Sequence, residues 1–220
     1  MPGGRLSPLQ ERILHALAPV APPWTLTGGG ALAGVHLGHR ETRDLDLFWR
    51  NRVALGDIVR DVLAALRAGG LDVQVLRASP AFGELRVGDG RDVCVVDLVA
   101  EPFGPIEPPQ RAELAGVTIA VDTAHEILVN KLTALLSRSE LRDLVDVKAL
   151  LDAGGDLDRG LADAPAKDSG FSILTLAWVL RGFDPRPLAL ALGWSEADIA
   201  TIEAFRVWLL HRLTSLSAPE

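Results

Sequence analysis

Apolar residues recur along the first 122 positions with two different spacings, which predict a mixture of helices and strands. A spacing of three to four residues predicts helices over 8–17 and 55–66. Short apolar or alternating runs predict strands over 24–27, 44–48, 71–76, 81–87, 91–99 and 116–121. Gly88-Asp89-Gly90 predicts a hairpin turn, because glycine supplies the positive φ that a tight turn needs. Strands and helices in this order predict an α/β domain with a sheet of mixed direction.

The pattern from residue 123 onward is helical. Thr123 and Glu126 have capping-box spacing at the start of one helix, and Ser139 is expected to cap a second helix. Residues 152–170 carry scattered Gly, Asp and Pro and are expected to form a flexible connection. Further helices are predicted over 173–180, 187–192 and 196–213. We therefore predict two domains, a sheet domain over 1–122 and a helical domain over 123–220 that closes its cleft.

Residues 28–48 carry the strongest candidate chemistry. Three consecutive glycines at 28–30 stand between a strand and a helical segment, where backbone N–H groups can approach a phosphate. Strand alternation then places Asp44 and Asp46 on one face, with Cα atoms roughly 6.6 Å apart. Such carboxylates repel each other unless a cation lies between them, and Mg²⁺ takes these ligands together with substrate phosphates. Either feature alone is common on surfaces, whereas the combination points to a metal and nucleotide site.

A third carboxylate, Asp97, lies in the apolar strand 91–99. The valines and leucine around it predict a strand that is buried on both faces. A carboxylate buried there requires a cationic or hydrogen-bonding partner, since an unpaired one is costly. The alternative is an aspartate exposed just past the end of the sheet, where it accepts a loop N–H.

The motifs together resemble the AbiEii-type abortive-infection toxins, within the nucleotidyltransferases of the polymerase-beta type. The matching residues are Gly28-Gly29-Gly30-Ala31-Leu32-Ala33, Leu37-Gly38-His39-Arg40, Asp44-Leu45-Asp46-Leu47-Phe48, Val96-Asp97 before Pro102-Phe103, and Lys131 before Arg138, Arg142, Asp143 and Asp146. One position departs from the family pattern, which has a hydroxyl residue where this chain has Gly30. A side-chain contact to phosphate is therefore missing there, and backbone amides would have to suffice.

The resemblance implies a role for each matching residue and a polymerase-beta-like fold with flanking helices. The implied metal ligands and catalytic residues are Asp44, Asp46 and Asp97, with Lys131 as a further catalytic residue. The implied nucleotide-binding residues are Gly28, Gly29, Gly30, Arg40, Lys131 and Arg142. A plainer alternative makes Lys131 an ordinary surface lysine and Arg142 the partner of Asp146 in an i,i+4 ion pair.

The implied activity is transfer of a nucleoside monophosphate from an NTP to tRNA or another RNA, with two Mg²⁺ ions, or Mn²⁺, as cofactor. The protein would act as the toxin of a toxin–antitoxin system and would have a cognate antitoxin. A second hypothesis keeps the site but makes the acceptor a small molecule, as in aminoglycoside adenylyltransferases. A third is an NTP-binding regulator without catalysis, which the missing hydroxyl at Gly30 suggests. A glycosyltransferase also uses Asp-x-Asp, but the early glycine turn and the short chain disfavour it.

Charge and composition narrow these classes. The formal net charge of −7 disfavours a protein that binds nucleic acid through its bulk charge, so an RNA partner requires a local site. No apolar run reaches the roughly 20 residues that span a bilayer, and residues 1–5 lack the build of a signal peptide. The single cysteine, Cys94, cannot form an internal disulfide and lies in an apolar run. We therefore expect a cytoplasmic protein without a membrane role.

Overall fold

The computed structural model describes residues 6–216, so the N-terminal residues considered above for a signal peptide lie outside the described part. The chain forms two compact units, Met1–Ile127 and Leu128–Glu220. The boundary predicted at residue 122 lies shortly before this division. Across residues 6–216, no helix has both the length and the apolar character that crossing a bilayer requires.

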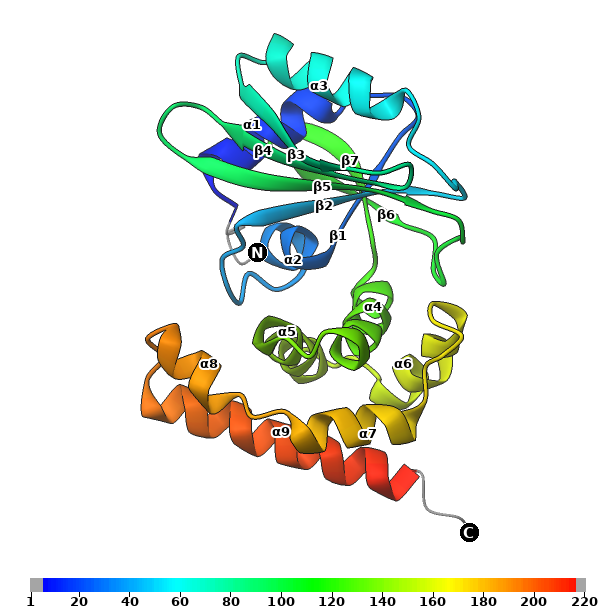
Figure 1. Cartoon of the computed structure of the whole chain (residues 1–220), viewed down its shortest axis with the longest axis vertical. Helices are drawn as coiled ribbons and strands as arrows, with labels where there is room; N and C mark the ends of the chain where they lie inside the picture. Colours follow the sequence, from blue (N-terminus) through cyan, green and yellow to red (C-terminus); the bar gives the residue numbers. More distant parts are fainter. Residues whose placement is uncertain (1–5, 217–220) are drawn as a thin grey trace. The chain divides into compact units, whose positions relative to one another are not determined.

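A mixed sheet organises the first unit (Figure 1). Within the described residues it has seven strands in the order β3-β4-β5-β2-β1-β7-β6. The strands are β1 (Thr25–Thr27), β2 (Asp44–Arg50), β3 (Asp72–Ala78), β4 (Phe82–Gly88), β5 (Val93–Glu101), β6 (Gln110–Leu114) and β7 (Val117–Val121). The pairs β2–β5 and β1–β7 are parallel and the remaining pairs are antiparallel. The prediction of an α/β fold with a sheet of mixed direction is confirmed.

Helices lie on both sides of this sheet. Figure 1 shows α1 (Pro8–Leu17) and α3 (Ile58–Ala68) over one face, and the short α2 (Gly28–Ala31) on the other side. The predicted capping box of α1 is present, since Ser7 accepts from the Gln10 backbone N–H and Gln10 accepts from the Ser7 N–H. Buried leucines and valines of the central strands form the core of this unit, and Gly30 of α2 packs against two of them, Leu45 and Leu26.

The sequence patterns predicted no strand over residues 110–114, where the structure has β6. Its side chains are exposed or half-buried, because β6 is an edge strand that pairs only with β7. Its apolar residues, Ala112 and Leu114, do alternate with polar ones, but two apolar positions in a strand of 5 residues are too few for a pattern to predict it. A usable signal was the turn between β6 and β7, where Ala115 and Gly116 both have positive φ.

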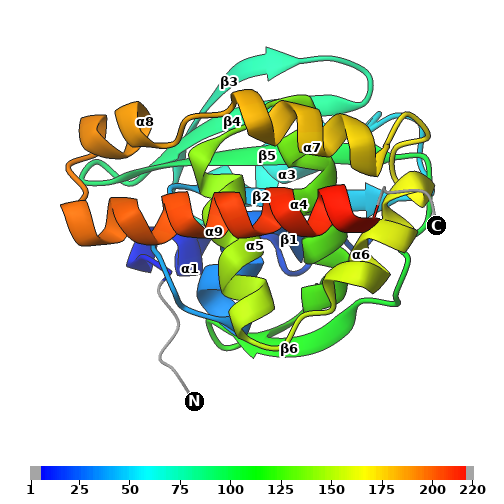
Figure 2. The ribbon, with the colours of Figure 1, turned by 90° about the horizontal axis from the view of Figure 1, so that it is seen from below.

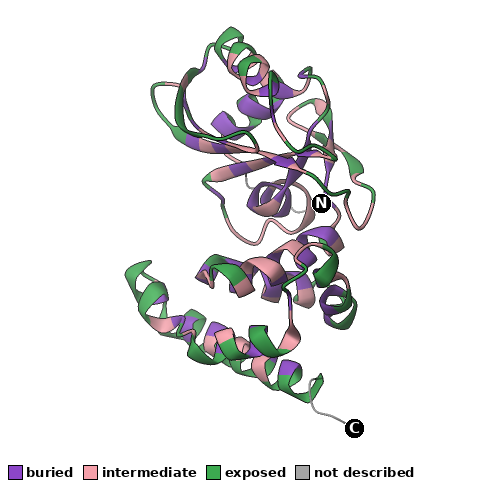
Figure 3. Ribbon diagram, turned by 45° about the vertical axis from the view of Figure 1, so that its right-hand side comes forward, coloured by how far each residue is buried: buried purple, intermediate pink, exposed green. Residues whose placement is uncertain are grey.

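Helices make up the second unit, in which α9 lies alongside α7 and α8 (Figure 2). The helices after β7 are α4 (Ala124–Ser137), α5 (Leu141–Asp152), α6 (Leu157–Asp163), α7 (Ile173–Gly182), α8 (Arg186–Ala191) and α9 (Glu196–Leu216). The last three helices carry much exposed surface (green in Figure 3). The α7, α8 and α9 positions agree with the predicted segments to within a few residues.

Two local predictions in this half are wrong. The segment 152–170 is not a flexible connection, because it contains α6, whose N-cap Asp156 accepts from the Arg159 N–H. Gly160 made the segment look like a loop in the sequence. Its missing Cβ lets α6 approach α4, since a Cβ there would lie 3.1 Å from Leu132 Cδ1. Ser139 does not cap α5 either, since the N-cap is Glu140 and the Ser139 hydroxyl donates to the Leu135 carbonyl.

Candidate active site

Strand β2 presents the two predicted aspartates on one face. Its odd-numbered residues, Leu45, Leu47 and Trp49, are buried, whereas Asp44 and Asp46 are half-buried on the other face. The alternation predicted from the sequence is therefore confirmed. The apolar side chains hold the strand in the core and thereby fix the direction in which both carboxylates point.

Strand β5 places the third aspartate beside them. In the parallel β2–β5 pair, Asp46 is the register partner of Asp97, so the two side chains extend from the same face of neighbouring strands, about 4.8 Å apart. The structure thus brings all three predicted carboxylates to one face. The expectation that β5 is buried on both faces is wrong, because Val95, Asp97 and Val99 are only half-buried. The open side of the strand is the face that carries the acids.

The glycines predicted to form a turn are the first residues of α2, and this glycine turn of the helix lies directly against the acidic face. Gly28 has φ +58°, and a Cβ built on it would lie 2.2 Å from Asp46 Oδ2. Residue 28 must therefore be glycine for two reasons: its φ is positive, and no Cβ fits between its backbone and the carboxylate. At Gly29, a Cβ would lie 2.8 Å from Thr42 Oγ1 and 3.3 Å from Arg40 Nη2. The structure therefore brings Gly28, Gly29 and Arg40 to the end of β2 that carries the acids.

Gly30 faces the apolar core. A Cβ at this position would lie 2.9 Å from Leu45 Cδ2 and 3.1 Å from Leu26 Cδ1. Since both leucines are fully buried, a threonine or serine here would require them to move. The departure from the family pattern thus matches the packing of this chain, and any contribution of Gly30 to phosphate binding would come from its backbone N–H.

Sequence reasoning missed Thr42. Its side chain is buried, and its hydroxyl donates a hydrogen bond to the Asp44 carboxylate. Its backbone carbonyl accepts from the Gln10 Nε2–H at 3.0 Å, which ties this residue to α1. The hydrogen bond fixes the orientation of Asp44, as partners of metal-binding carboxylates commonly do. A hydroxyl residue two positions before an Asp-x-Asp is the signal that could have pointed to it.

Replacing Thr42 with valine should lower nucleotide transfer about 10- to 100-fold, the usual cost of losing such a partner. Valine keeps the shape of the side chain but cannot donate, so the Asp44 carboxylate loses its fixed orientation. The kcat of the transfer reaction measures the effect. A Thr42→Ser variant retains the hydroxyl and should recover most of the activity, and equal losses in both variants would contradict a positioning role.

The acidic face fits a hard cation without being closed around one. In the part of the chain that the structure describes, no group of three or more His, Cys, Asp or Glu side chains is already arranged to hold a metal ion. The donors nevertheless suit one, since three carboxylates share a face and carboxylate oxygens are the ligands that hard cations prefer.

Lys131 and the matching residues that follow it, Arg138, Asp143 and Asp146, form an ion network around buried carboxylates within the helical unit. Lys131 Nζ lies 2.9 Å from Asp143 Oδ1 and 2.8 Å from Asp146 Oδ2, and Arg138 Nε lies 2.7 Å from Asp143 Oδ2. Burial opposes the charge on Lys131, but Asp146 and Asp143 outweigh it and raise its pKa. Burial likewise opposes the charge on Asp143, but Arg138 and Lys131 lower its pKa. Arg142 Nε lies 2.5 Å from Glu140 Oε2.

Replacing Lys131 with methionine should lower the free energy of unfolding by about 3 kcal/mol, because it leaves two buried carboxylates without their shared cation. Urea denaturation measures this change. The matched control is Lys148→Met, which breaks the more exposed i,i+4 pair with Asp152 and should cost about 0.5 kcal/mol or less. Equal costs for the two variants would show that the network is not a stabilising element.

The same network predicts a dependence of stability on pH. The pKa of Asp143 is lowered from 3.8, so its contribution is present above that pH and is lost as the pH falls through the lower folded value. The pKa of Lys131 is raised from 10.5, so its contribution is present below that pH and is lost as the pH rises through the higher folded value. The excess cost of Lys131→Met should therefore be largest between these limits.

A second buried network lies at the other end of β2. Arg50 ends β2 and lies on the same face of the strand as Asp44 and Asp46. Its guanidinium pairs with Glu101, with Asp122 at 2.5 Å and with Glu126 at 3.5 Å. Burial raises the pKa of Asp122, and the charge of Arg50 opposes this rise. The network ties β2 to β5, to the end of β7 and to the start of α4. Sequence patterns could not find it, because its members are far apart in the chain.

Comparison with known proteins gives a consistent result. A family model described as "Nucleotidyl transferase AbiEii toxin, Type IV TA system" matches residues 12–197. MenT4, a nucleotidyltransferase toxin from Mycobacterium tuberculosis H37Rv, is 20% identical over 95% of this chain and 82% of that chain, with a TM-score of 0.64. A candidate nucleotidyltransferase from H. pylori is 20% identical over 96% of both chains, with a TM-score of 0.53. The antibiotic-resistance factor ANT(2'')-Ia is 18% identical over 73% of this chain and 90% of that chain, with a TM-score of 0.51. These structural likenesses concern the fold, and no curated protein sequence matches the chain.

Proposed function

The chain belongs to the AbiEii family of nucleotidyl transferase toxins, and from this premise we propose that it transfers a nucleoside monophosphate from an NTP to RNA, with tRNA as the first candidate acceptor. We further propose that the reaction depends on a divalent cation, with Mg²⁺ as the first candidate. One observation carries the proposal: Asp46 stands beside Asp97 in register and directly against the Gly28 turn. Acidic groups and a turn fit for phosphate thus meet at one point.

We propose a separate role in this reaction for the glycines and Arg40 and for the three aspartates. The N–H groups of Gly28 and Gly29, with Arg40, would orient the triphosphate. Asp44, Asp46 and Asp97 would hold the divalent cation, which neutralises charge on the phosphate oxygens when bound. Asp97 also accepts the proton of the acceptor hydroxyl. That hydroxyl oxygen then bonds to the α-phosphorus while the bond to the bridging oxygen breaks and pyrophosphate leaves.

We also propose that Lys131 and Arg142 contact the phosphates, as the family resemblance implies. The Lys131 ammonium is already bound by two carboxylates, so a contact to phosphate would have to share or replace one of them. The proposal therefore rests on the residues of the first unit. Since the family description names a type IV toxin–antitoxin system, we also propose a cognate antitoxin and a cytoplasmic setting.

The test is a transfer assay with the purified protein, four α-³²P-labelled NTPs, Mg²⁺ and unfractionated tRNA. Label on the RNA, with pyrophosphate release that stops when Mg²⁺ is omitted, would support the proposal. Label on an aminoglycoside but not on RNA would replace it with the small-molecule hypothesis. NTP binding without pyrophosphate release in the presence of either acceptor would favour the regulator.

A further inference from the structure

The row of acids on the sheet continues beyond Asp97 onto the two outer strands. Glu84 on β4 is the register partner of Asp97, and Arg77 on β3 is the register partner of Glu84. Asp46, Asp97, Glu84 and Arg77 therefore stand in one line across four neighbouring strands, on the same face. Arg77 Nε lies 3.2 Å from Glu84 Oε2.

A β-bulge in β3 produces this alignment. The register shifts between Val75, which pairs with Leu85, and Arg77, which pairs with Glu84. The extra residue, Leu76, reverses the alternation, so Arg77 points to the acidic face instead of the opposite one. Bulges are common next to active sites because they redirect a side chain in this way.

Arg86 adds a second guanidinium to the same face. It lies two residues after Glu84 on β4, and its register partner Val95 is in turn the partner of Asp44. Arg86 is exposed, and among residues 6–216 no hydrogen bond or ion pair engages its side chain. The Arg77 side chain is 76% exposed. Two exposed guanidinium groups thus stand within about 10 to 15 Å of the carboxylates, counted as two to three strand spacings.

We propose that Arg77, Glu84 and Arg86 form the acceptor-binding surface of this enzyme, and that it binds the phosphates of a nucleic-acid acceptor. This inference rests on the proposed function. Gly28 follows β1, so the triphosphate would lie on the β1 side of Asp46. The attacking hydroxyl must then approach from the other side, past Asp97, which is where β4 and β3 lie.

Charge decides which class of acceptor this surface fits. With a formal net charge of −7, the chain attracts a polyanion only through a local group of cations. Arg86 supplies an unpaired cation next to the acids, and Glu84 holds Arg77 in position. A polycationic aminoglycoside would be repelled by the unpaired Arg86 guanidinium, whereas RNA phosphates would pair with it.

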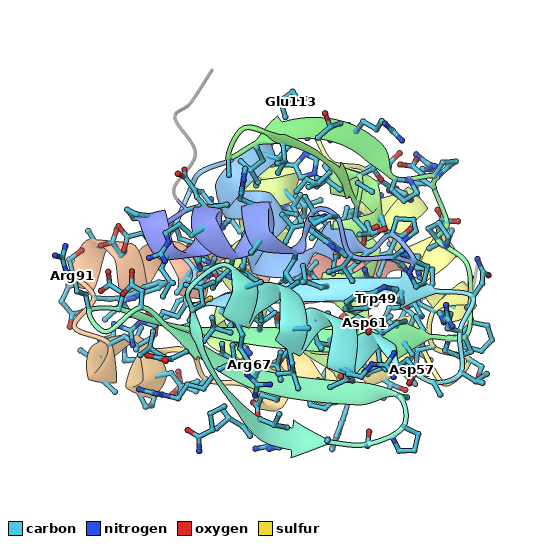
Figure 4. All side chains as sticks on the ribbon, turned by 90° about the horizontal axis from the view of Figure 1, so that it is seen from above. Trp49, Asp57, Asp61, Arg67, Arg91 and Glu113 are labelled. Carbon is cyan, nitrogen blue, oxygen red and sulfur yellow. The ribbon has the colours of Figure 1, made fainter. Side chains whose placement is uncertain are left out.

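The experiment measures the binding of fluorescein-labelled unfractionated tRNA by anisotropy, for the wild type, Arg86→Glu and Arg67→Glu. Arg67 is a matched control, since it is exposed on α3, on the opposite side of the sheet (Figure 4). Arg86→Glu should raise Kd at least tenfold and should flatten the dependence of log Kd on log salt by about one unit. Arg67→Glu should leave both unchanged. The KM for tRNA in the transfer assay should rise with Arg86→Glu.

The outcomes separate this inference from the function on which it rests. Equal tRNA affinities for Arg86→Glu and Arg67→Glu, or wild-type protein that does not bind tRNA, would overturn the acceptor surface. Loss of tRNA binding in Arg86→Glu alone would support it, even if the wild type transferred no label. In that last case, the proposed transfer reaction would fail while the binding surface would stand.

Discussion

Replacing Asp46 with asparagine should lower nucleotide transfer about 1,000-fold while the protein remains folded. Asp46 lies at the centre of the site, with Asp97 beside it in register and Gly28 directly against its Oδ2. Asparagine has nearly the same shape but no charge, so the variant loses the charge that holds a cation on the triphosphate. The loss of one preorganised electrostatic group of this kind costs about 10²- to 10³-fold in kcat, and a metal ligand should lie at the upper end.

Asp46→Asn should lower activity without lowering stability. Two carboxylates that face each other across neighbouring strands repel, so removing one charge should leave the free energy of unfolding equal or raise it by about 0.5 kcal/mol. The kcat/KM for label transfer and the urea midpoint measure the two effects. Asp72→Asn is the control, because Asp72 is an exposed carboxylate on the edge strand β3 and should change neither quantity. An Asp46→Asn enzyme with more than a tenth of wild-type activity would place the chemistry elsewhere.

Local patterns were enough to predict the parts of the site that a single strand or turn determines. The alternation around Asp44 and Asp46 follows from the period of a strand. The three glycines were expected in a turn before a helix, whereas in the structure they are the first residues of α2 itself. The edge strand β6 was missed because its alternation covers only two apolar positions and neither is buried. For Asp97, the apolar neighbours predict burial on both faces, because a sequence pattern cannot distinguish a core from the half-open face of a site.

The contacts that assemble the site were beyond local reasoning, because they depend on strand pairing and helix packing. The register that sets Asp97 beside Asp46 joins residues 51 positions apart, and the bulge that aligns Arg77 with Glu84 leaves no trace in the composition of β3. The Lys131 network likewise joins two helices. The family resemblance pointed to Asp46, Asp97 and Lys131, whereas their partners, and the pair of Arg77 with Glu84, come from the structure.

The second large effect is expected for Gly28→Ala, which should lower transfer about 100-fold and the free energy of unfolding by about 2 kcal/mol. Alanine at φ +58° strains the backbone by roughly 1 kcal/mol. In addition, its Cβ would lie 2.2 Å from Asp46 Oδ2, so the carboxylate must move. A displacement of about 1 Å in a reacting group can cost 100-fold in rate. The transfer assay and urea denaturation again measure both effects.

Two further variants separate strain from displacement. Gly56→Ala imposes the same strain, since Gly56 has φ +56°, but no atom lies within 4 Å of the added Cβ, so it should cost about 1 kcal/mol and no activity. In an Asp46→Ala background the clashing oxygen is gone, and the cost of Gly28→Ala should fall to the level of Gly56→Ala. The difference between the two backgrounds is the coupling energy between turn and carboxylate. A coupling energy near zero would mean that the turn does not position Asp46, and the site built on their contact would have to be abandoned.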